Sequence, residues 1–290
     1  MSAGIINGNT VAQKVRDEVA AGVDALIEAR GEAARPCLAL IVFENDPVSL
    51  RLVGMKKRDC ESVGISARVF RLPEETGERE LIELIARLNG DPGVTGILCQ
   101  LPLPAHINTK KVLAAVDKAK DADGFSAEIG CDRSDIAACT PAGIIRLIEE
   151  TGVEICGKHA VIVGRSNIVG KPMAIQLLLR DATVTVCHTK TKNLAELTRL
   201  ADILVVAAGC PGLVTADMVK PGAIVIDVGM NYTENGLVGD VDHEAAAEVA
   251  SFITPVPGGV GPMTRAMLLY NTFLLAQKAN SEFGIRNSEL

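Results

Sequence analysis

Apolar residues recur along this chain with two alternating periods, which predict helices and buried strands in turn. Residues 9–31 are predicted to form a helix with one buried face, made by Val11, Val15, Val19, Val23 and Leu26. Continuous apolar runs then predict strands at 37–43, 67–71 and 94–100, separated by helices at 48–63 and 77–89. This βαβαβ order requires right-handed crossovers and a parallel sheet.

A second series of strands and helices follows the first. We expect a short helix at 108–116, a polar, irregular connection at 121–140, and a helix at 142–150. Strands are predicted at 159–163, 183–186, 203–207 and 223–228, with a helix at 173–180. A last apolar helix at 266–277 is expected to pack on the first half. The chain is therefore predicted to be an α/β protein of two domains, 1–140 plus 266–290 and 141–265.

Composition supports a parallel α/β core and excludes some partners. Of the 290 residues, 48% are hydrophobic but only 3% are aromatic and none is tryptophan, so Val, Ile, Leu and Ala must fill the core. The formal charge of −7 argues against nucleic acid or an anionic membrane as the main partner.

The eight cysteines are scattered singly, with no CxxC pair and no histidine spacing suited to zinc. We find no signal peptide and no apolar run long enough to cross a bilayer. These features predict a reduced, cytoplasmic protein without a metal site.

Residues 254–264 form an unusually stiff segment, with three prolines and three glycines immediately before an apolar helical run. Prolines fix φ, while glycines let the backbone approach a ligand closely. The segment is interpreted as shaping a binding site, although a tight structural turn is the alternative.

A nucleotide site is predicted where the strand 159–163 runs into a short loop and a helix. Free amides and the helix dipole at such a helix start favour a phosphate. The candidate residues are Gly164, Arg165, Ser166, Ile168, Val169 and Gly170. The spacing is not GxGxxG, so an ordinary βα turn stays an alternative.

The residues after the next two strands favour NADP over NAD as the cofactor. The strand at 183–186 is followed by His188 and Thr189 and by no carboxylate, which suits a 2′-phosphate together with Arg165. Ala208 and Gly209 are small enough for a flat ring to lie against the backbone. A surface salt bridge is the alternative role of Arg165.

A second site is predicted in the first half of the chain. Leu52 and Lys56 lie four residues apart and share one helix face. Gln100 ends a strand and is followed by the rigid run that contains Pro102 and Leu103, at the sheet edge where ligands bind. Lys56, Gln100 and Asp123 could then face one cleft. The alternative for Lys56 is a solvated basic face over residues 56–58.

Five motifs in order, at 100–104, 120–125, 139–141, 164–172 and 255–264, carry a family resemblance. Together they resemble the bifunctional methylenetetrahydrofolate dehydrogenase/methenyltetrahydrofolate cyclohydrolase family, of the FolD type, over most of the chain. The resemblance implies an N-terminal folate-binding domain and a Rossmann-like NADP domain flanking a cleft, and usually a homodimer. It also implies oxidation of 5,10-methylenetetrahydrofolate with NADP, then hydrolysis to 10-formyltetrahydrofolate, in one-carbon metabolism.

The resemblance further assigns roles to residues of both halves. It implies that Lys56 serves the hydrolysis, that Gln100 tunes it, and that Asp123 accepts hydrogen bonds from the pterin. Hydride removal needs positioning rather than a base, whereas attack of water on the cationic product needs one. The implied folate-binding residues are Leu52, Pro102, Leu103, Pro257, Gly258, Gly259, Val260, Gly261 and Pro262.

One departure from the family pattern concerns the predicted folate site. The family usually carries a tyrosine one helical turn before the lysine, and this chain has Leu52 there. Leucine loses a stacking contribution of about 0.5–1.5 kcal/mol and a hydroxyl that could orient Lys56. Three functions therefore stay open: the bifunctional enzyme or a dehydrogenase with weak or lost hydrolysis, a catalytically silent nucleotide or folate binder, and another NADP oxidoreductase.

Overall fold

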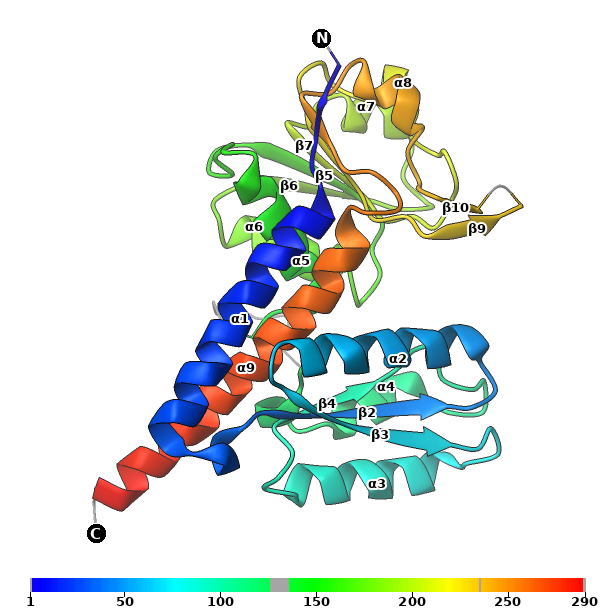
Figure 1. Ribbon diagram of the computed structural model, residues 1–290. Helices are drawn as coiled ribbons and strands as arrows, with labels where there is room; N and C mark the ends of the chain where they lie inside the picture. The colour runs from blue at the N-terminus through cyan, green and yellow to red at the C-terminus, as the bar shows by residue number, and fades with distance from the viewer. Residues whose placement is uncertain (1, 126–135, 235, 289–290) are drawn as a thin grey trace. The chain divides into compact units, whose positions relative to one another are not determined.

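The computed structural model describes residues 2–125, 136–234 and 236–288, and the chain divides into two compact units. The unit with the larger sheet, here called the six-stranded unit, holds residues 2–13 and 138–267. The three-stranded unit holds residues 14–125, 136–137 and 268–288. Helices α1 (Gly8–Arg30) and α9 (Val260–Ser288) each begin in the first and end in the second (Figure 1).

The three-stranded unit contains a parallel sheet in the order β3-β2-β4. Its strands are β2 (Cys37–Phe43), β3 (Ser66–Leu72) and β4 (Gly96–Cys99). Its other helices are η1 (Glu32–Ala34), α2 (Pro47–Ser62), α3 (Glu78–Gly90), α4 (Thr109–Ala115) and η2 (Lys118–Lys120). Figure 1 shows α2 on one face of the sheet and α3 on the other. Every residue of β2 is buried, as expected for a central strand covered on both faces.

Local signals in the sequence explain where α2 begins. Asp46 is its N-cap, and the Asp46 carboxylate accepts the amide N–H of Val48 at 3.0 Å. Pro47 is the first helical residue, a position where the missing N–H carries no penalty. The helix start is therefore fixed directly after β2, at the carboxyl edge of the sheet.

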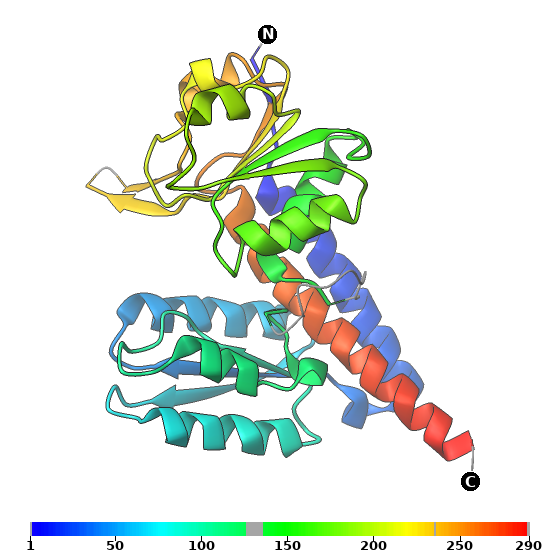
Figure 2. The same ribbon diagram turned by 180° about the vertical axis from the view of Figure 1, so that it is seen from behind.

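The six-stranded unit contains a fully parallel sheet in the order β1-β11-β8-β7-β5-β6. Its strands are β1 (Gly4–Ile5), β5 (His159–Val163), β6 (Thr183–Cys187), β7 (Ile203–Val206), β8 (Ile224–Asp227) and β11 (Phe252–Ile253). Its other helices are α5 (Cys139–Glu150), α6 (Gly170–Leu178), α7 (Leu194–Thr198), η3 (Ala216–Met218) and α8 (His243–Ala247). A small antiparallel hairpin of β9 (Asn231–Thr233) and β10 (Gly236–Val238) projects from this unit (Figure 2).

The predicted strands and helices of both halves are present, with shifts at their ends. Helix α6 begins at Gly170, where the nucleotide-loop prediction placed a helix start, whereas α9 begins at Val260, inside the segment predicted to be a stiff loop. The chain also forms β1, β9, β10, β11, α7 and α8, which the apolar pattern did not predict. Residues 126–135 of the expected irregular connection, with Cys131, lie outside the described residues.

The two chain ends differ in how they relate to the predicted domains. Strand β1 pairs with β11, so residues 4–5 belong to the six-stranded unit although the prediction placed them in the first domain. At the other end, Asn271 of α9 donates to the carbonyls of Ala122 and Ala137 at 3.0 and 2.9 Å. Helix α9 therefore packs on the first half of the chain, as expected.

Three general properties of the described residues bear on function. None of their helices combines the length and apolar character needed to cross a membrane. Seven cysteines in this part of the chain are free thiols. Within the same described ranges, no cluster of three or more His, Cys, Asp or Glu side chains could hold a metal ion.

Candidate active site

In the three-stranded unit, the predicted site lies at the carboxyl edge of the sheet. Strand β2 lies between β3 and β4, so the chain order reverses at β2, and ligands of open α/β sheets bind at such a point. Gln100 follows β4 directly, and its amide N–H donates to the carbonyl of Ile41 at 2.8 Å. The backbone of Gln100 is thereby fixed beside β2, from which α2 departs.

Lys56 and Gln100 are in direct contact. The Lys56 ammonium donates to Gln100 Oε1 at 3.0 Å, and Gln100 Nε2 donates to the carbonyl of Leu101 at 2.6 Å. The second bond fixes which end of the Gln100 amide faces Lys56. Lys56 is half-buried, whereas Lys57 and Arg58 are exposed. The first residue of the basic run therefore differs from its neighbours, which argues against a solvated face for Lys56.

Asp123 lies close enough to Lys56 for the two charges to interact. Removal from water raises the pKa of Asp123 to about 6, the positive charge of Lys56 opposes this rise, and the Asp121 carboxylate adds to it. Asp121 is buried, and its carboxylate accepts the amide N–H of Gly124 at 3.0 Å. That bond holds the turn carrying Asp123, so Lys56, Gln100 and Asp123 form one cluster.

The other folate-site candidates of this unit lie on α2 and on the loop after β4. Leu52 is half-buried, one helical turn before Lys56. The peptide bond between Leu101 and Pro102 is cis, and Pro102 is exposed. Leu103 packs against the hydrophobic core that the sheet forms with α3 and α4. Packing in the core is therefore a second role for Leu103, besides the predicted contact with folate.

The proline- and glycine-rich segment belongs to the six-stranded unit. It includes a cis peptide bond between Val256 and Pro257. The remaining candidates there are Gly258, Gly259, Val260, Gly261 and Pro262, of which the last three form the first turn of α9. Thr264, one turn further, shares a hydrogen bond of 2.9 Å with Thr140 of α5.

The loop between β5 and α6 is shaped by close backbone contacts. Gly164 has φ +131°, and a Cβ there would overlap the carbonyl of Ala207, so only glycine fits. Ser166 Oγ accepts the amide N–H groups of Val169 and Gly170 at 3.1 and 3.3 Å. Ser166 therefore occupies two of the amides that the sequence predicted to be free for a phosphate.

Besides Ser166, two of the predicted cofactor residues in this loop are exposed to solvent and could contact a ligand. Arg165 and Ile168 are exposed, and the described residues include no ion pair with Arg165. After β6, a side chain of the turn itself stabilises the turn, because Thr191 Oγ1 accepts the amide N–H of His188 at 2.8 Å. His188 is half-buried and Thr189 is exposed.

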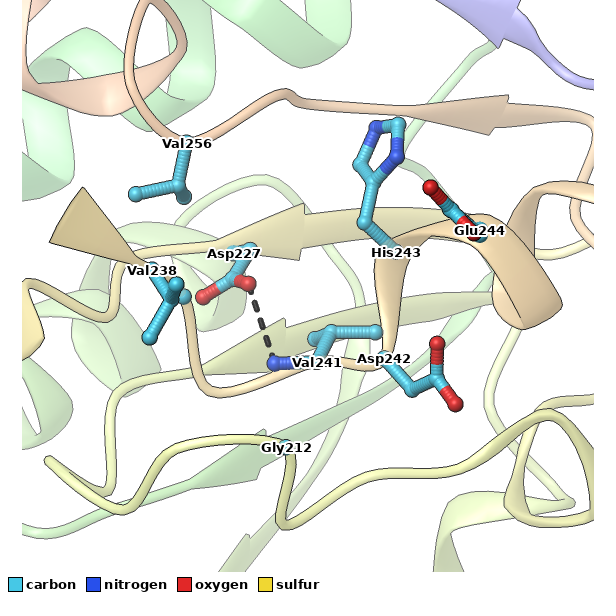
Figure 3. A pocket seen from close by; sticks show the side chains of 9 residues that line it. Gly212, Asp227, Val238, Val241, Asp242, His243, Glu244 and Val256 are labelled. Atoms are coloured by element: carbon cyan, nitrogen blue, oxygen red, sulfur yellow. Dashed lines mark hydrogen bonds between the residues drawn. The ribbon is translucent and has the colours of Figure 1, made fainter. Parts of the chain in front are cut away.

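The third segment predicted to bind the cofactor, after β7, is held by a residue that was not among the sequence candidates. The amides of Ala208 and Gly209 both donate to Asp240 Oδ2, at 2.7 and 2.8 Å. Asp227, at the end of β8, accepts the amide of Val241 at 3.0 Å, as Figure 3 shows. Asp227 ends a buried strand, which the sequence could have indicated, whereas the partners of Asp240 are main-chain amides that carry no side-chain signal.

Asp227 also borders a cavity of about 380 Å³ in the six-stranded unit (Figure 3). Its lining consists of Gly212, Asp227, Val238, Gly239, Val241, Asp242, His243, Glu244 and Val256. None of the predicted cofactor or folate residues lines it.

A parallel sheet with a glycine-dependent loop after β5 defines the six-stranded unit as a dinucleotide-binding fold of the α/β class. Family models agree: residues 6–123 match the tetrahydrofolate dehydrogenase/cyclohydrolase catalytic domain and residues 138–280 match the NAD(P)-binding domain of the same family. The chain belongs to the tetrahydrofolate dehydrogenase/cyclohydrolase family.

Individual relatives agree with this assignment over nearly the whole chain. The bifunctional protein FolD of Ruminiclostridium cellulolyticum is 50% identical over 278 residues, covering 94% of this chain and 97% of that protein. The crystal structure of the bifunctional enzyme FolD of Campylobacter jejuni has a TM-score of 0.92 and 44% identity, covering 96% of this chain and all of the other. The Trypanosoma brucei enzyme, complexed with NADP and an inhibitor, has a TM-score of 0.90 and 37% identity, covering 96% of this chain and 99% of the other.

Proposed function

We propose that this chain oxidises 5,10-methylenetetrahydrofolate with NADP and hydrolyses the methenyl product to 10-formyltetrahydrofolate, using Lys56, Gln100 and Asp123 in the folate site. The family supports the two activities, and the NAD(P)-binding domain supports the cofactor. The observation that carries the residue assignment is the Lys56–Gln100 hydrogen bond of 3.0 Å, beside Asp123, in the segment matched by the catalytic domain.

The oxidation requires positioning more than acid–base chemistry. A hydride leaves the carbon between two nitrogens, and the positive charge left behind is delocalised over both nitrogens. No proton moves in this step, so the contribution of the chain is to hold the folate and the cofactor in register. When bound, the nicotinamide supplies the hydride acceptor.

The hydrolysis requires a base, and Lys56 is the group proposed for it. Water adds to the cationic carbon and gives one proton to the base, which leaves a hydroxyl group on that carbon. The bond from this carbon to one nitrogen then breaks as that nitrogen takes up a proton, and the hydroxyl loses its own proton to become the formyl C=O. A neutral Lys56 amine that still donates to Gln100 Oε1 keeps its lone pair free for the water proton. Gln100 therefore acts through the orientation of Lys56.

Asp123 is proposed to hold the pterin ring. A carboxylate can accept two parallel hydrogen bonds from the amino group and the ring N–H of a pterin. Because burial raises the pKa of Asp123 only to about 6, the carboxylate is ionised at neutral pH and can accept both bonds.

The cofactor is proposed to bind along three loops at the carboxyl edge of the larger sheet. These are the loops with Gly164 to Gly170, with His188 and Thr189, and with Ala208 and Gly209. The close approach of the Gly164 backbone to Ala207 fits a site built from main chain, and exposed Arg165 suits the 2′-phosphate of NADP.

The test is a spectrophotometric assay with 5,10-methylenetetrahydrofolate and NADP that follows NADPH and the methenyl product separately. NADPH without accumulation of the methenyl product is the expected result. The absence of NADPH with either NADP or NAD would contradict the proposal and favour a silent binder or another substrate.

A second candidate function is a dehydrogenase with weakened hydrolysis. It is favoured by Leu52, which offers Lys56 no hydroxyl on the neighbouring turn of α2. In the same assay this candidate predicts NADPH together with accumulating methenyl product. A homodimer through the NADP domain and a cytoplasmic location are further proposals from the family resemblance; sedimentation at two protein concentrations tests the first.

A further inference from the structure

The loop after β7 converges on one buried carboxylate. The amides of Ala208, Gly209 and Cys210 donate to Asp240 at 2.7, 2.8 and 2.9 Å, and Asn231 Nδ2 donates at 2.8 Å. Asp240 is 0% exposed, whereas Ala208, Gly209 and Cys210 are exposed. Four donors match the roughly four acceptor sites of one carboxylate, so the side chain is fully engaged.

This arrangement sets the chemistry of the loop. Successive amide N–H groups that converge form a concavity that binds anions, as in phosphate sites. Here the chain fills that concavity with its own carboxylate. The amides of residues 208–210 are therefore withheld from a phosphate, and the exposed outer face of the loop is presented in a fixed shape.

The position of this loop also affects the loop after β5. The carbonyl of Ala207, the residue before the Asp240-bound amides, lies against Gly164 with no room for a side chain. Gly170, the first residue of α6, lies equally close to the carbonyl of Gly164. A shift of the β7 loop would therefore displace the backbone of the β5 loop.

A second buried carboxylate fixes Asp240 from behind. Asp227 Oδ1 accepts the amides of Gly229 and Asp240, each at 2.9 Å. A Cβ at Gly239 would overlap the Asp227 carboxylate, so the segment before Asp240 lies directly on Asp227. Asp240 is thus held by the end of β8 while it holds the loop after β7.

We propose that Asp240 is a positioning residue for NADP: by occupying the amide concavity after β7, it fixes the loop 207–210 as a contact surface for the neutral nucleoside part of the cofactor. The phosphates are then directed to the loop after β5. This inference rests on the proposed cofactor site and goes beyond it, because Asp240 is not among the residues proposed to contact the cofactor.

The decisive variant is Asp240→Asn, which preserves size but replaces one acceptor oxygen by a donor NH₂. In either orientation of the amide, this NH₂ meets N–H donors: Ala208 and Gly209 on one side, or Cys210 and Asn231 on the other. Asp242→Asn is the matched control, since Asp242 is exposed and asparagine caps a helix about as well.

The measurements are the KM for NADP and kcat of the dehydrogenase, NADP affinity by calorimetry, and the cyclohydrolase rate without NADP. For Asp240→Asn we expect the KM and Kd for NADP to rise about tenfold or more, since hydrogen bonds to a charged group are lost. The KM for the folate and the cyclohydrolase rate should stay within about twofold, which shows that the fold is intact, and Asp242→Asn should behave as the wild type.

Each alternative result has a distinct meaning. An unchanged NADP affinity in Asp240→Asn, with a wild type that binds NADP, overturns the inference alone. Parallel loss of both activities assigns Asp240 to general stability and overturns it too. If the wild type binds no NADP, the inference falls together with the cofactor assignment. Should Asp240→Asn not fold, Asn231→Ala removes one donor only and is expected to weaken NADP binding about threefold; no change then overturns the inference.

Discussion

Replacing Gln100 by methionine tests whether the hydrolysis depends on the orientation of Lys56. Methionine has nearly the length of glutamine but neither accepts from Lys56 nor donates to the carbonyl of Leu101. A hydrogen bond to a charged group contributes about 1.5–3 kcal/mol. If that contribution acts on the transition state of hydrolysis, the cyclohydrolase kcat falls about 10- to 100-fold, at about 1.4 kcal/mol per factor of ten. Hydride removal needs no base, so dehydrogenase kcat should change by less than about threefold.

The assay measures both activities of the same preparation and includes one matched substitution. Gln176→Met removes a similar bond, from Arg180 to Gln176 Oε1 at 2.9 Å, on α6 of the six-stranded unit. This control should leave the cyclohydrolase rate unchanged. An equal loss of both activities in Gln100→Met would refute the reasoning, because Gln100 would then serve folate binding or the fold. An unchanged cyclohydrolase rate would refute it as well.

Three further substitutions or conditions probe the same sites. Leu52→Tyr should raise the cyclohydrolase rate more than the dehydrogenase rate, because a hydroxyl beside Lys56 is restored; equal effects in the two assays would contradict this. The carboxylate of Asp123 gains a proton below its pKa of about 6 and then no longer accepts both hydrogen bonds from the pterin. Calorimetry should therefore show that the affinity for a stable 5-formyl folate falls about tenfold per pH unit below pH 6. This pH dependence should vanish in Asp123→Asn. Gly164→Ala forces a side chain against the Ala207 carbonyl at a backbone φ of +131°. It should lower the free energy of unfolding by about 1–3 kcal/mol and weaken NADP binding. Unchanged thermal unfolding would argue against the close packing of Gly164 on Ala207.

The central strands of both sheets could be predicted because burial on both faces makes their sequences continuously apolar. For example, all four residues of β7 are buried, and the unbroken apolar run at 203–207 predicted this strand. Strand β1 could not be found in this way, since it has two residues and exists through pairing with β11, which follows it by almost 250 positions. The hairpin of β9 and β10 exposes Tyr232 and carries no buried face to reveal it.

Helix starts were harder to predict than the helices themselves. Helix α9 begins at Val260 although Pro262 follows within its first turn. Proline is tolerated there, because the first N–H groups of a helix have no partner inside it. The proline- and glycine-rich composition of 254–264 therefore indicated a loop over residues that are partly helical.

The candidate site was predictable where side chains act and unpredictable where backbone amides act. Lys56 and Gln100 are far apart in sequence, but the rule that ligand groups gather at the carboxyl ends of parallel strands brought them together. Asp240 binds main-chain amides some thirty positions earlier, and amides have no side-chain signature in the sequence. Only the fold shows that this carboxylate belongs to the loop with Ala208 and Gly209.

The separation of the residues between the two units makes the two activities independent probes. Lys56, Gln100 and Asp123 belong to the three-stranded unit, whereas Asp240 and the loops proposed for NADP belong to the six-stranded unit. Hydrolysis consumes water and no NADP, so a defect confined to the NADP loops leaves the cyclohydrolase rate intact. A defect in the orientation of Lys56 instead lowers hydrolysis and spares hydride removal. Opposite patterns in Asp240→Asn and Gln100→Met would therefore locate each residue in its step, because a general loss of folding lowers both rates together.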